Sequence, residues 1–219
     1  MKTSTLPPGA RGFDANARVS SEAADAFLAK GFLFAIRYIP RHEVHDYDLS
    51  AGEVPNILGA GLGLMVVQHV GNPGWMPTAD LGTEYAGVAV KALGDCGIPA
   101  EVTVWCDLEG VNPDAKAEDV IAYLNAWFDV VDAIGYTPGL YVGDSCGLTP
   151  DQLHSALKFQ FYWSAYNLNA GRFPAVRGVC MRQHAAKPSD FVPGFDNQNM
   201  DIDVISPDAL GGTPTLLFQ

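Results

Sequence analysis

Short apolar runs alternate along this chain with longer segments in which apolar residues recur at helical spacing. The short runs stop at polar residues, glycine or proline, as strands do, and the longer segments are typical of amphipathic helices. The pattern predicts strands at residues 11–15, 32–39, 62–69, 102–110, 138–143, 161–166, 177–184 and 201–205. It predicts helices at residues 22–30, 53–60, 79–96, 113–134 and 150–158.

This alternation of strands and helices is the pattern of parallel βα units, and eight strands suggest a closed barrel. We therefore expect an α/β fold, a single (β/α)8 TIM-like barrel. The helical signal fades after residue 166, so the last units should have short or missing helices. Residues 1–10 contain two prolines and a glycine and are expected to be an N-terminal lead-in, with residues 11–219 forming one domain.

The strand at residues 102–110, VTVWCDLEG, carries the first candidate chemistry in its two carboxylates, Asp107 and Glu109. Side chains of a strand alternate between its faces, so these two acids share a face. At about 3.3 Å per residue they lie roughly 6–7 Å apart. Glycosidases place two carboxyl groups roughly 5 to 9.5 Å apart around the scissile bond. An isolated D-x-E motif can equally be a solvated strand end, so the rest of the chain must decide.

Other polar and aromatic residues lie at or near predicted strand ends, where barrels of this type carry their chemistry. They are Asp14, Arg37, Tyr38, Gln68, Tyr141, Trp163 and Gln183, together with Asp201 and Asp203 near the start of the eighth strand. Acids that converge on one mouth repel one another, which raises at least one pKa and keeps a carboxylic acid protonated near neutral pH. Trp75, on the loop at residues 71–78, could stack on a sugar or cap the barrel.

Charge and composition narrow the choice of partner. The net charge of −12, without a basic run, disfavours nucleic acid and anionic membranes but is compatible with a neutral or amphoteric glycan. The four cysteines form no C-x-x-C pair, which argues against a zinc knuckle or a redox site. No stretch has the pattern of a signal peptide or a membrane span, so we expect synthesis in the cytoplasm and delivery by another route.

Six motifs in order carry a family resemblance: GFDAN, CDLEG, PGLYVG, FYWSAY, RQH and MDID. Their order along residues 11–205 resembles that of the glycoside hydrolase family 25 lysozymes. It is more similar still to their relatives, the glycoside-hydrolase-like domains labelled DUF1906 or Rv2525c-like. Two segments, AIRYIP and VVQHV, depart from the family 25 pattern and favour the Rv2525c-like branch.

The resemblance implies a modified TIM barrel that cleaves the β-1,4 bond between N-acetylmuramic acid and N-acetylglucosamine in peptidoglycan. It implies that Glu109 is the general acid and that Asp107 supports the reacting sugar. Asp14 and Asp201 match the first-strand and last-strand acids. The groove residues it implies are Trp163, Tyr166 and Gln183, with Asp203 where the lysozymes often have asparagine, and Arg37 and Tyr38 as replacements for lost sugar contacts.

Three hypotheses follow for the function. The first is a peptidoglycan glycosidase that acts on the cell wall as a monomer, without a cofactor and without inserting into membranes. It would be either a phage endolysin released through a holin or a toxin injected by a secretion machine. The second is a catalytically inactive glycan-binding barrel. The third is a metal-dependent hydrolase in which Asp14, Asp107, Glu109 and a histidine, His69 or His184, hold a divalent cation.

Overall fold

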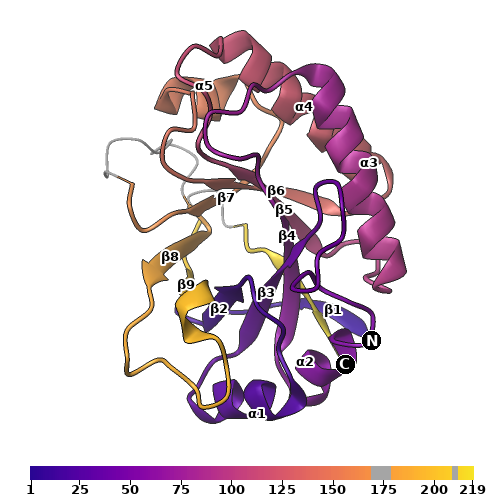
Figure 1. The fold of residues 1–219 in the computed structure, drawn as a ribbon, viewed down its shortest axis with the longest axis vertical. Coiled ribbons are helices and arrows are strands. Elements are labelled where there is room, and N and C mark those ends of the chain that lie inside the picture. The colour runs from indigo at the N-terminus through magenta and orange to yellow at the C-terminus, as the bar shows by residue number, and fades with distance from the viewer. Residues whose placement is uncertain (169–178, 209–211) are drawn as a thin grey trace.

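A computed structural model of this chain describes residues 1–168, 179–208 and 212–219. In it, eight strands close into a barrel (Figure 1). Each strand pairs with the next in the chain, and β9 pairs with β2 to close the ring. The barrel strands are β2 (Arg11–Ala15), β3 (Phe34–Ile39), β4 (Gly63–Gln68), β5 (Thr103–Leu108), β6 (Thr137–Val142), β7 (Phe161–Ser164), β8 (Met181–Ala185) and β9 (Met200–Ile205). The predicted barrel is therefore confirmed. The predicted seventh strand began at residue 177, and its residues 177–178 lie outside the described residues.

The last barrel strand, β9, runs antiparallel to both of its neighbours, whereas the other barrel strands are parallel. A parallel strand needs a crossover that returns the chain to the opposite end of the sheet. Between β8 and β9 the described residues form only a short 3-10 helix, Asn197–Asn199. The chain thus re-enters the barrel from the end it has just left. As a result, the start of β9 lies at the same mouth as the carboxyl ends of the parallel strands.

The two chain ends add strands that the sequence did not predict. β1 (Lys2–Thr5) pairs with β10 (Thr215–Phe218), and β10 pairs with β4 where Leu217 faces Leu64. β4 pairs with β5 only through its last three residues, Val66, Val67 and Gln68, and β10 pairs with the earlier part of β4. There the Thr215 amide donates to Thr103 Oγ1 at 2.9 Å. The segment expected to be a lead-in therefore helps to close the end of the barrel opposite the mouth.

Helices cover the outside of the barrel in two groups, with α1 and α2 on one side and α3, α4 and α5 on the other (Figure 1). Their bounds are α1 Ser21–Ala29, α2 Val54–Gly59, α3 Ala79–Asp95, α4 Ala117–Ala133 and α5 Pro150–Ser155. Ser20, Thr78 and Thr149 cap three of them with side-chain oxygens. None of the helices described is both long and apolar enough to cross a membrane.

Arg37 lies on the outward side of β3, where it forms a buried ion pair with Glu53 beside α2. Its Nε is 2.6 Å from Glu53 Oε1, and the two residues are 0% and 4% exposed. The guanidinium also donates to the carbonyls of Ala15 and Tyr47. The expectation that Arg37 contacts substrate is therefore wrong, because every donor group is directed into the layer between the barrel and its helices.

Gln68 also points outward, away from the mouth. Its Nε2 donates to the carbonyls of Pro40 and Tyr85 at 3.0 and 2.7 Å, and its Oε1 accepts from Trp127 Nε1 at 2.7 Å. Gln68 thus ties the end of β4 to α3 and α4. The prediction of a substrate contact is wrong here too, because nearness to a strand end does not determine which face a side chain occupies.

We predict that Arg37→Met destabilises the fold by ~3–5 kcal/mol, because it leaves the Glu53 carboxylate buried without its partner. Urea unfolding followed by circular dichroism measures the change. Arg182→Met is the matched control, since the Arg182 side chain is exposed on β8 and its loss should change stability by at most ~0.5 kcal/mol. Equal stability of Arg37→Met and the control would contradict the structural role of the pair.

Candidate active site

Asp107, in β5, and Glu109, the first residue after β5, both point into the mouth of the barrel. Cys106 and Leu108 face the helices, so strand alternation turns Trp105, Asp107 and Glu109 inward. Asp107 lies beside Tyr141 of the neighbouring strand β6. Immediately after Glu109 the chain turns at Gly110, which has a φ of 62° and donates its amide hydrogen to the Asp144 carbonyl at 2.9 Å.

A missing side chain at Gly143, directly after β6, makes room for Glu109. A Cβ built on Gly143 would lie 2.2 Å from Glu109 Oε2 and 2.6 Å from Glu109 Cβ, so any side chain at this position must displace Glu109. The Gly143 amide donates to the Leu108 carbonyl at 2.9 Å, which holds the two backbones together at this point. The carboxyl group of Glu109 is thereby packed against the backbone of the next strand.

Asp14 lies across the mouth on β2 and is held by a chain of hydrogen bonds. Gln183 Nε2 donates to Asp14 Oδ2 at 2.9 Å, and Tyr38 donates its hydroxyl to Asp14 Oδ1 at 3.4 Å. Gln183 in turn accepts from the Tyr141 hydroxyl at 3.0 Å. Asp14 is 4% exposed, so these donors replace much of the water that the carboxylate loses. Side chains from four strands thus meet at one point.

The reversed strand β9 supplies two further acids to the same face. Asp201 is paired directly with Asp14, and Asp203 is paired with Gln183. Directly opposite residues of antiparallel strands share a face, so both acids point inward. Asp203 is fully buried below the mouth, whereas Asp201 is partly buried and borders the opening.

Burial raises the pKa of every acid in this group, and repulsion by neighbouring acids raises the pKa of all of them except Asp14. Burial, then the charges of Glu109 and Asp14, hold the pKa of Asp107 well above its ordinary value. Burial raises the pKa of Glu109, and the charges of Asp144 and Asp14 raise it further. Burial and the charge of Asp14 raise the pKa of Asp201 to about 7. A raised pKa keeps a carboxyl group protonated at higher pH, which is what a general acid requires.

Two of the acids, Asp14 and Asp201, line an open cleft of about 300 Å³ between β2, β3 and β9, whereas Asp107 and Glu109 are not among its lining residues. The Asn16 amide donates to the Asn199 carbonyl at 3.0 Å and so ties the two sides of the cleft together. Sequence reasoning missed Asn16, although its position two residues after Asp14 places both on one face. The lining residues are Asp14, Asn16, Tyr38, Tyr166, Gln198, Asn199, Met200 and Asp201.

The predicted tryptophans lie below and beside the acids, not in the open cleft. Trp163 is 1% exposed and packs on Tyr141, with ring centroids 4.5 Å apart, so it forms the floor of the mouth. Trp75 donates its Nε1 hydrogen to the Glu109 carbonyl at 2.9 Å and contacts the Tyr123 ring edge-on. Of the two roles left open for Trp75, the structure supports the cap over the barrel.

The residues of the metal hypothesis do not form one centre. His69 Nε2 lies 2.9 Å from Asp48 Oδ1, outside the group of acids, and His184 is exposed on the outward side of β8. Within residues 1–168, 179–208 and 212–219, no group of three or more histidine, cysteine, aspartate or glutamate side chains has the geometry to hold a metal ion.

Comparison with known proteins identifies the family. The model of the Rv2525c-like, glycoside hydrolase-like domain matches residues 25–187. The chain belongs to this family. The match includes Asp107 and Glu109, whereas Asp14 and Asp201 lie outside the matched range. No curated protein matches the sequence closely enough to add to this assignment.

Solved structures show the same fold at low sequence identity. The Tat-secreted protein Rv2525c of Mycobacterium tuberculosis, solved with L-tartrate, has a TM-score of 0.65 and 17% identity over 91% of this chain and 96% of that one. The bacterial lysozyme of Streptomyces coelicolor has a TM-score of 0.62 and 13% identity, covering 95% and 94% of the two chains. A family 25 glycosyl hydrolase of Bacillus anthracis has the same TM-score and identity, covering 90% and 89%. The chain is therefore a glycoside hydrolase-like domain with the fold of these lysozymes.

We predict that Gly143→Ala displaces the Glu109 carboxyl group while leaving the barrel folded, because the new methyl group collides with Glu109 first. A displacement of about 1 Å in a reacting group can cost on the order of 10²-fold in rate. Any glycan-cleaving rate should fall by about that factor, with thermal unfolding close to that of the parent protein. Gly87→Ala on α3, where a Cβ meets nothing within 4 Å, is the control. A Gly143→Ala variant with the parent rate would contradict this packing.

We predict that Asp203→Asn stabilises the protein increasingly as pH rises. Burial, then the charge of Asp14, raises the pKa of Asp203 in the fold, whereas an unfolded aspartate titrates near about 3.9. Between these values the folded state binds the extra proton, so stability is lost as pH rises through the window. Thermal unfolding from pH 4 to pH 8 measures the difference, with the exposed Asp25→Asn as a surface control. A difference that does not change with pH would contradict the buried, proton-binding carboxyl group.

Proposed function

We propose that this protein is a glycosidase that hydrolyses the β-1,4 bond between N-acetylmuramic acid and N-acetylglucosamine in peptidoglycan, with Glu109 as the general acid. The observation that carries the proposal is the position of Glu109, which lies beside Asp107 and under the influence of Asp14 with a raised pKa. Membership in a glycoside hydrolase-like family supports the choice of a glycosidic bond.

The reaction would begin with a proton transfer. Protonated Glu109 donates to the glycosidic oxygen, the bond from that oxygen to the anomeric carbon breaks, and positive charge develops on the sugar ring. Asp107 supports that ring, either through its own charge or by orienting the N-acetyl group of the substrate. A water molecule then adds to the anomeric carbon and returns a proton to Glu109. Asp14 and Asp201 contribute negative charge around the ring. Burial, with the charges of Asp144 and Asp14, keeps the pKa of Glu109 raised.

The substrate would lie in the cleft beside these acids. Tyr38, Tyr166 and Asn16 line it, and tyrosine rings and amides are suited to the faces and hydroxyls of a sugar. We propose that the protein acts on the bacterial cell wall, reaching it as an endolysin through a holin or as an injected toxin.

We predict that Glu109→Gln lowers hydrolysis of purified cell walls by about 10²–10⁴-fold, the usual contribution of a general acid. Mass spectrometry of the released muropeptides would show new reducing-end N-acetylmuramic acid for the parent protein. Glu118→Gln, exposed near the start of α4, is the matched control and should keep the parent rate.

Two results would overturn the proposal. The first is a folded parent protein that releases no reducing ends, which would leave a glycan-binding barrel. The second is an undiminished rate in Glu109→Gln.

A further inference from the structure

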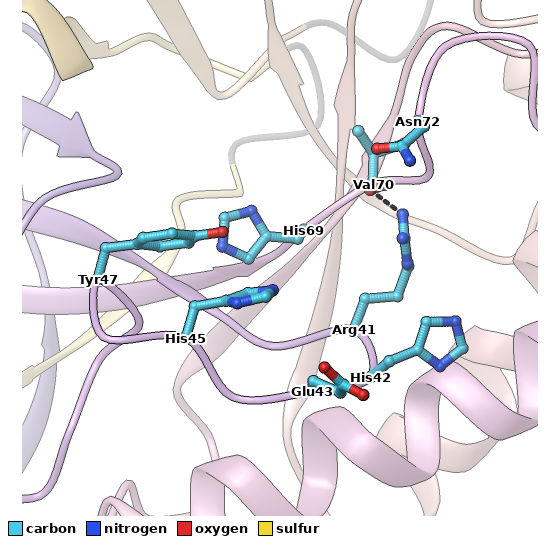
Figure 2. Close-up of a pocket in the computed structure, with 8 residues that line it drawn as sticks. All are labelled: Arg41, His42, Glu43, His45, Tyr47, His69, Val70 and Asn72. Carbon is cyan, nitrogen blue, oxygen red and sulfur yellow. Dashed lines mark hydrogen bonds between the residues drawn. The ribbon is translucent and has the colours of Figure 1, made fainter.

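A second and larger cavity opens at the same end of the barrel, beside the acidic mouth (Figure 2). It has a volume of about 580 Å³ and lies between the segments that follow β3 and β4. It has no part in the proposed reaction. The lining residues are Arg41, His42, Glu43, His45, Tyr47, His69, Val70 and Asn72.

The lining of this cavity contrasts with the rest of the molecule in charge. The chain carries a net charge of −12, and acids surround the adjacent mouth. Three of the five histidines of the chain, His42, His45 and His69, line the cavity together with Arg41. Figure 2 shows His45, Tyr47 and His69 grouped on one side and Arg41 and His42 on the other. Hydrogen-bond donors and potential positive charge are thus gathered at one site.

The histidine nearest the mouth is held in place by a buried carboxylate. His69 Nε2 lies 2.9 Å from Asp48 Oδ1, and Asp48 is 1% exposed. The other oxygen of Asp48 accepts the His45 amide hydrogen at 2.7 Å, which fixes the loop that carries His45. With Nε2 engaged by Asp48, Nδ1 is the nitrogen of His69 that remains for a ligand, and it donates a hydrogen bond to a carboxylate only when the imidazole is protonated. The imidazole is therefore oriented before any ligand arrives.

Arg41 is likewise fixed within the cavity wall. Its guanidinium donates to the Val70 carbonyl and lies over the Tyr85 ring, with Cζ 5.5 Å from the ring centroid. Its Nε is buried and has no hydrogen-bond partner within the protein. His42 Nε2 lies 3.1 Å from the Tyr85 hydroxyl beside it. An oriented guanidinium with spare donors is a typical receptor for a carboxylate.

One wall is shared by the cavity and the mouth. Tyr38 stacks on His69, with ring centroids 4.7 Å apart and planes at 29°. On its other side the Tyr38 hydroxyl donates to Asp14 in the mouth. A ligand bound beside Asp14 therefore has only this stacked pair between it and the histidines.

We propose that this cavity binds a carboxylate of the peptide stem on the muramic acid residue whose sugar lies in the mouth. The identification of the carboxylate as part of a peptidoglycan stem rests on the proposed function. The ability of the cavity to bind a carboxylate does not depend on that function. Among the branches of a peptidoglycan strand, the stem is the one that carries carboxylates, and the acids of the mouth would repel them. Arg41 offers the nearest complementary charge, and the histidines beside it can add hydrogen bonds. The preferred substrate is then a peptide-bearing glycan and not a bare one.

Binding measurements test this proposal without relying on turnover. In the Glu109→Gln background, histidine NMR resonances are followed during titration with N-acetylmuramyl-L-alanyl-D-isoglutamine, which has a free carboxylate, and with its fully amidated form. We expect the acid to shift the resonances of His45 and His69 and to bind at least about 10-fold more tightly than the amide, the usual loss when a hydrogen bond to a charged group is removed.

Variants locate the site. Arg41→Gln should weaken binding of the acid by at least about 10-fold. His45→Gln should also weaken binding of the acid. Because the His45 side chain is exposed, this variant can replace Arg41→Gln if that variant fails to fold. Arg182→Gln, an exposed arginine on β8, is the matched control and should bind as the parent does.

Three outcomes would overturn the proposal: equal binding of acid and amide, parent-like binding by both cavity variants, or equally tight binding of free D-isoglutamine, which would indicate a site for free carboxylates. Acid-selective binding without any wall hydrolysis by the parent protein would defeat only the proposed function. Wall hydrolysis without acid-selective binding would defeat only the carboxylate site.

Discussion

Burial of several like charges in one small mouth is the constraint on which this structure depends. Removing a carboxylate from water is unfavourable, and each neighbouring acid adds repulsion. Asp14, Asp107 and Asp203 are all buried, and burial raises the pKa of each. Repulsion by neighbouring acids raises the pKa of Asp107 and Asp203 further. The fold must hold them together against this cost. It does so with a closed ring of strands, a fully packed outer shell and a β10 strand that pairs with the earlier part of β4.

The direction of β9 determines whether the acids meet. If β9 ran parallel to β2, its first residues would lie at the opposite end of the barrel, and Asp201 would be far from Asp14. Because the chain has no crossover helix before β9, it enters at the mouth, and Asp201 and Asp14 become direct partners. The weak helical signal in the last part of the sequence is therefore connected with the chemistry, since it permits the reversal that brings two more acids to the site.

Strand spacing in the sequence was enough to predict the barrel, the D-x-E pair and the acid on the first strand. It was not enough to assign faces to Arg37 and Gln68. β3 and β4 are apolar on both faces, so the sequence shows no alternation of polar and apolar residues that would distinguish the inward face from the outward one. β1 was missed because KTST has no apolar alternation, and its pairing with β10 depends on contacts between the two ends of the chain. Gly143 could not be predicted as part of the site, since its importance lies in the space it leaves for Glu109.

The acidic mouth also limits what can lie beside it. A neutral sugar ring can enter, but any anionic group attached to that ring is repelled by carboxylates such as Asp14, which also raises the pKa of Glu109. A substrate with an acidic branch must therefore direct that branch away from the acids. The cavity containing Arg41 and His69 begins on the far side of Tyr38, and we propose that it prefers an anionic group. An acidic mouth beside a cavity that attracts anions would bind such a substrate in one orientation only, with its acidic branch directed toward Arg41. A uniformly acidic cleft would not select an orientation in this way.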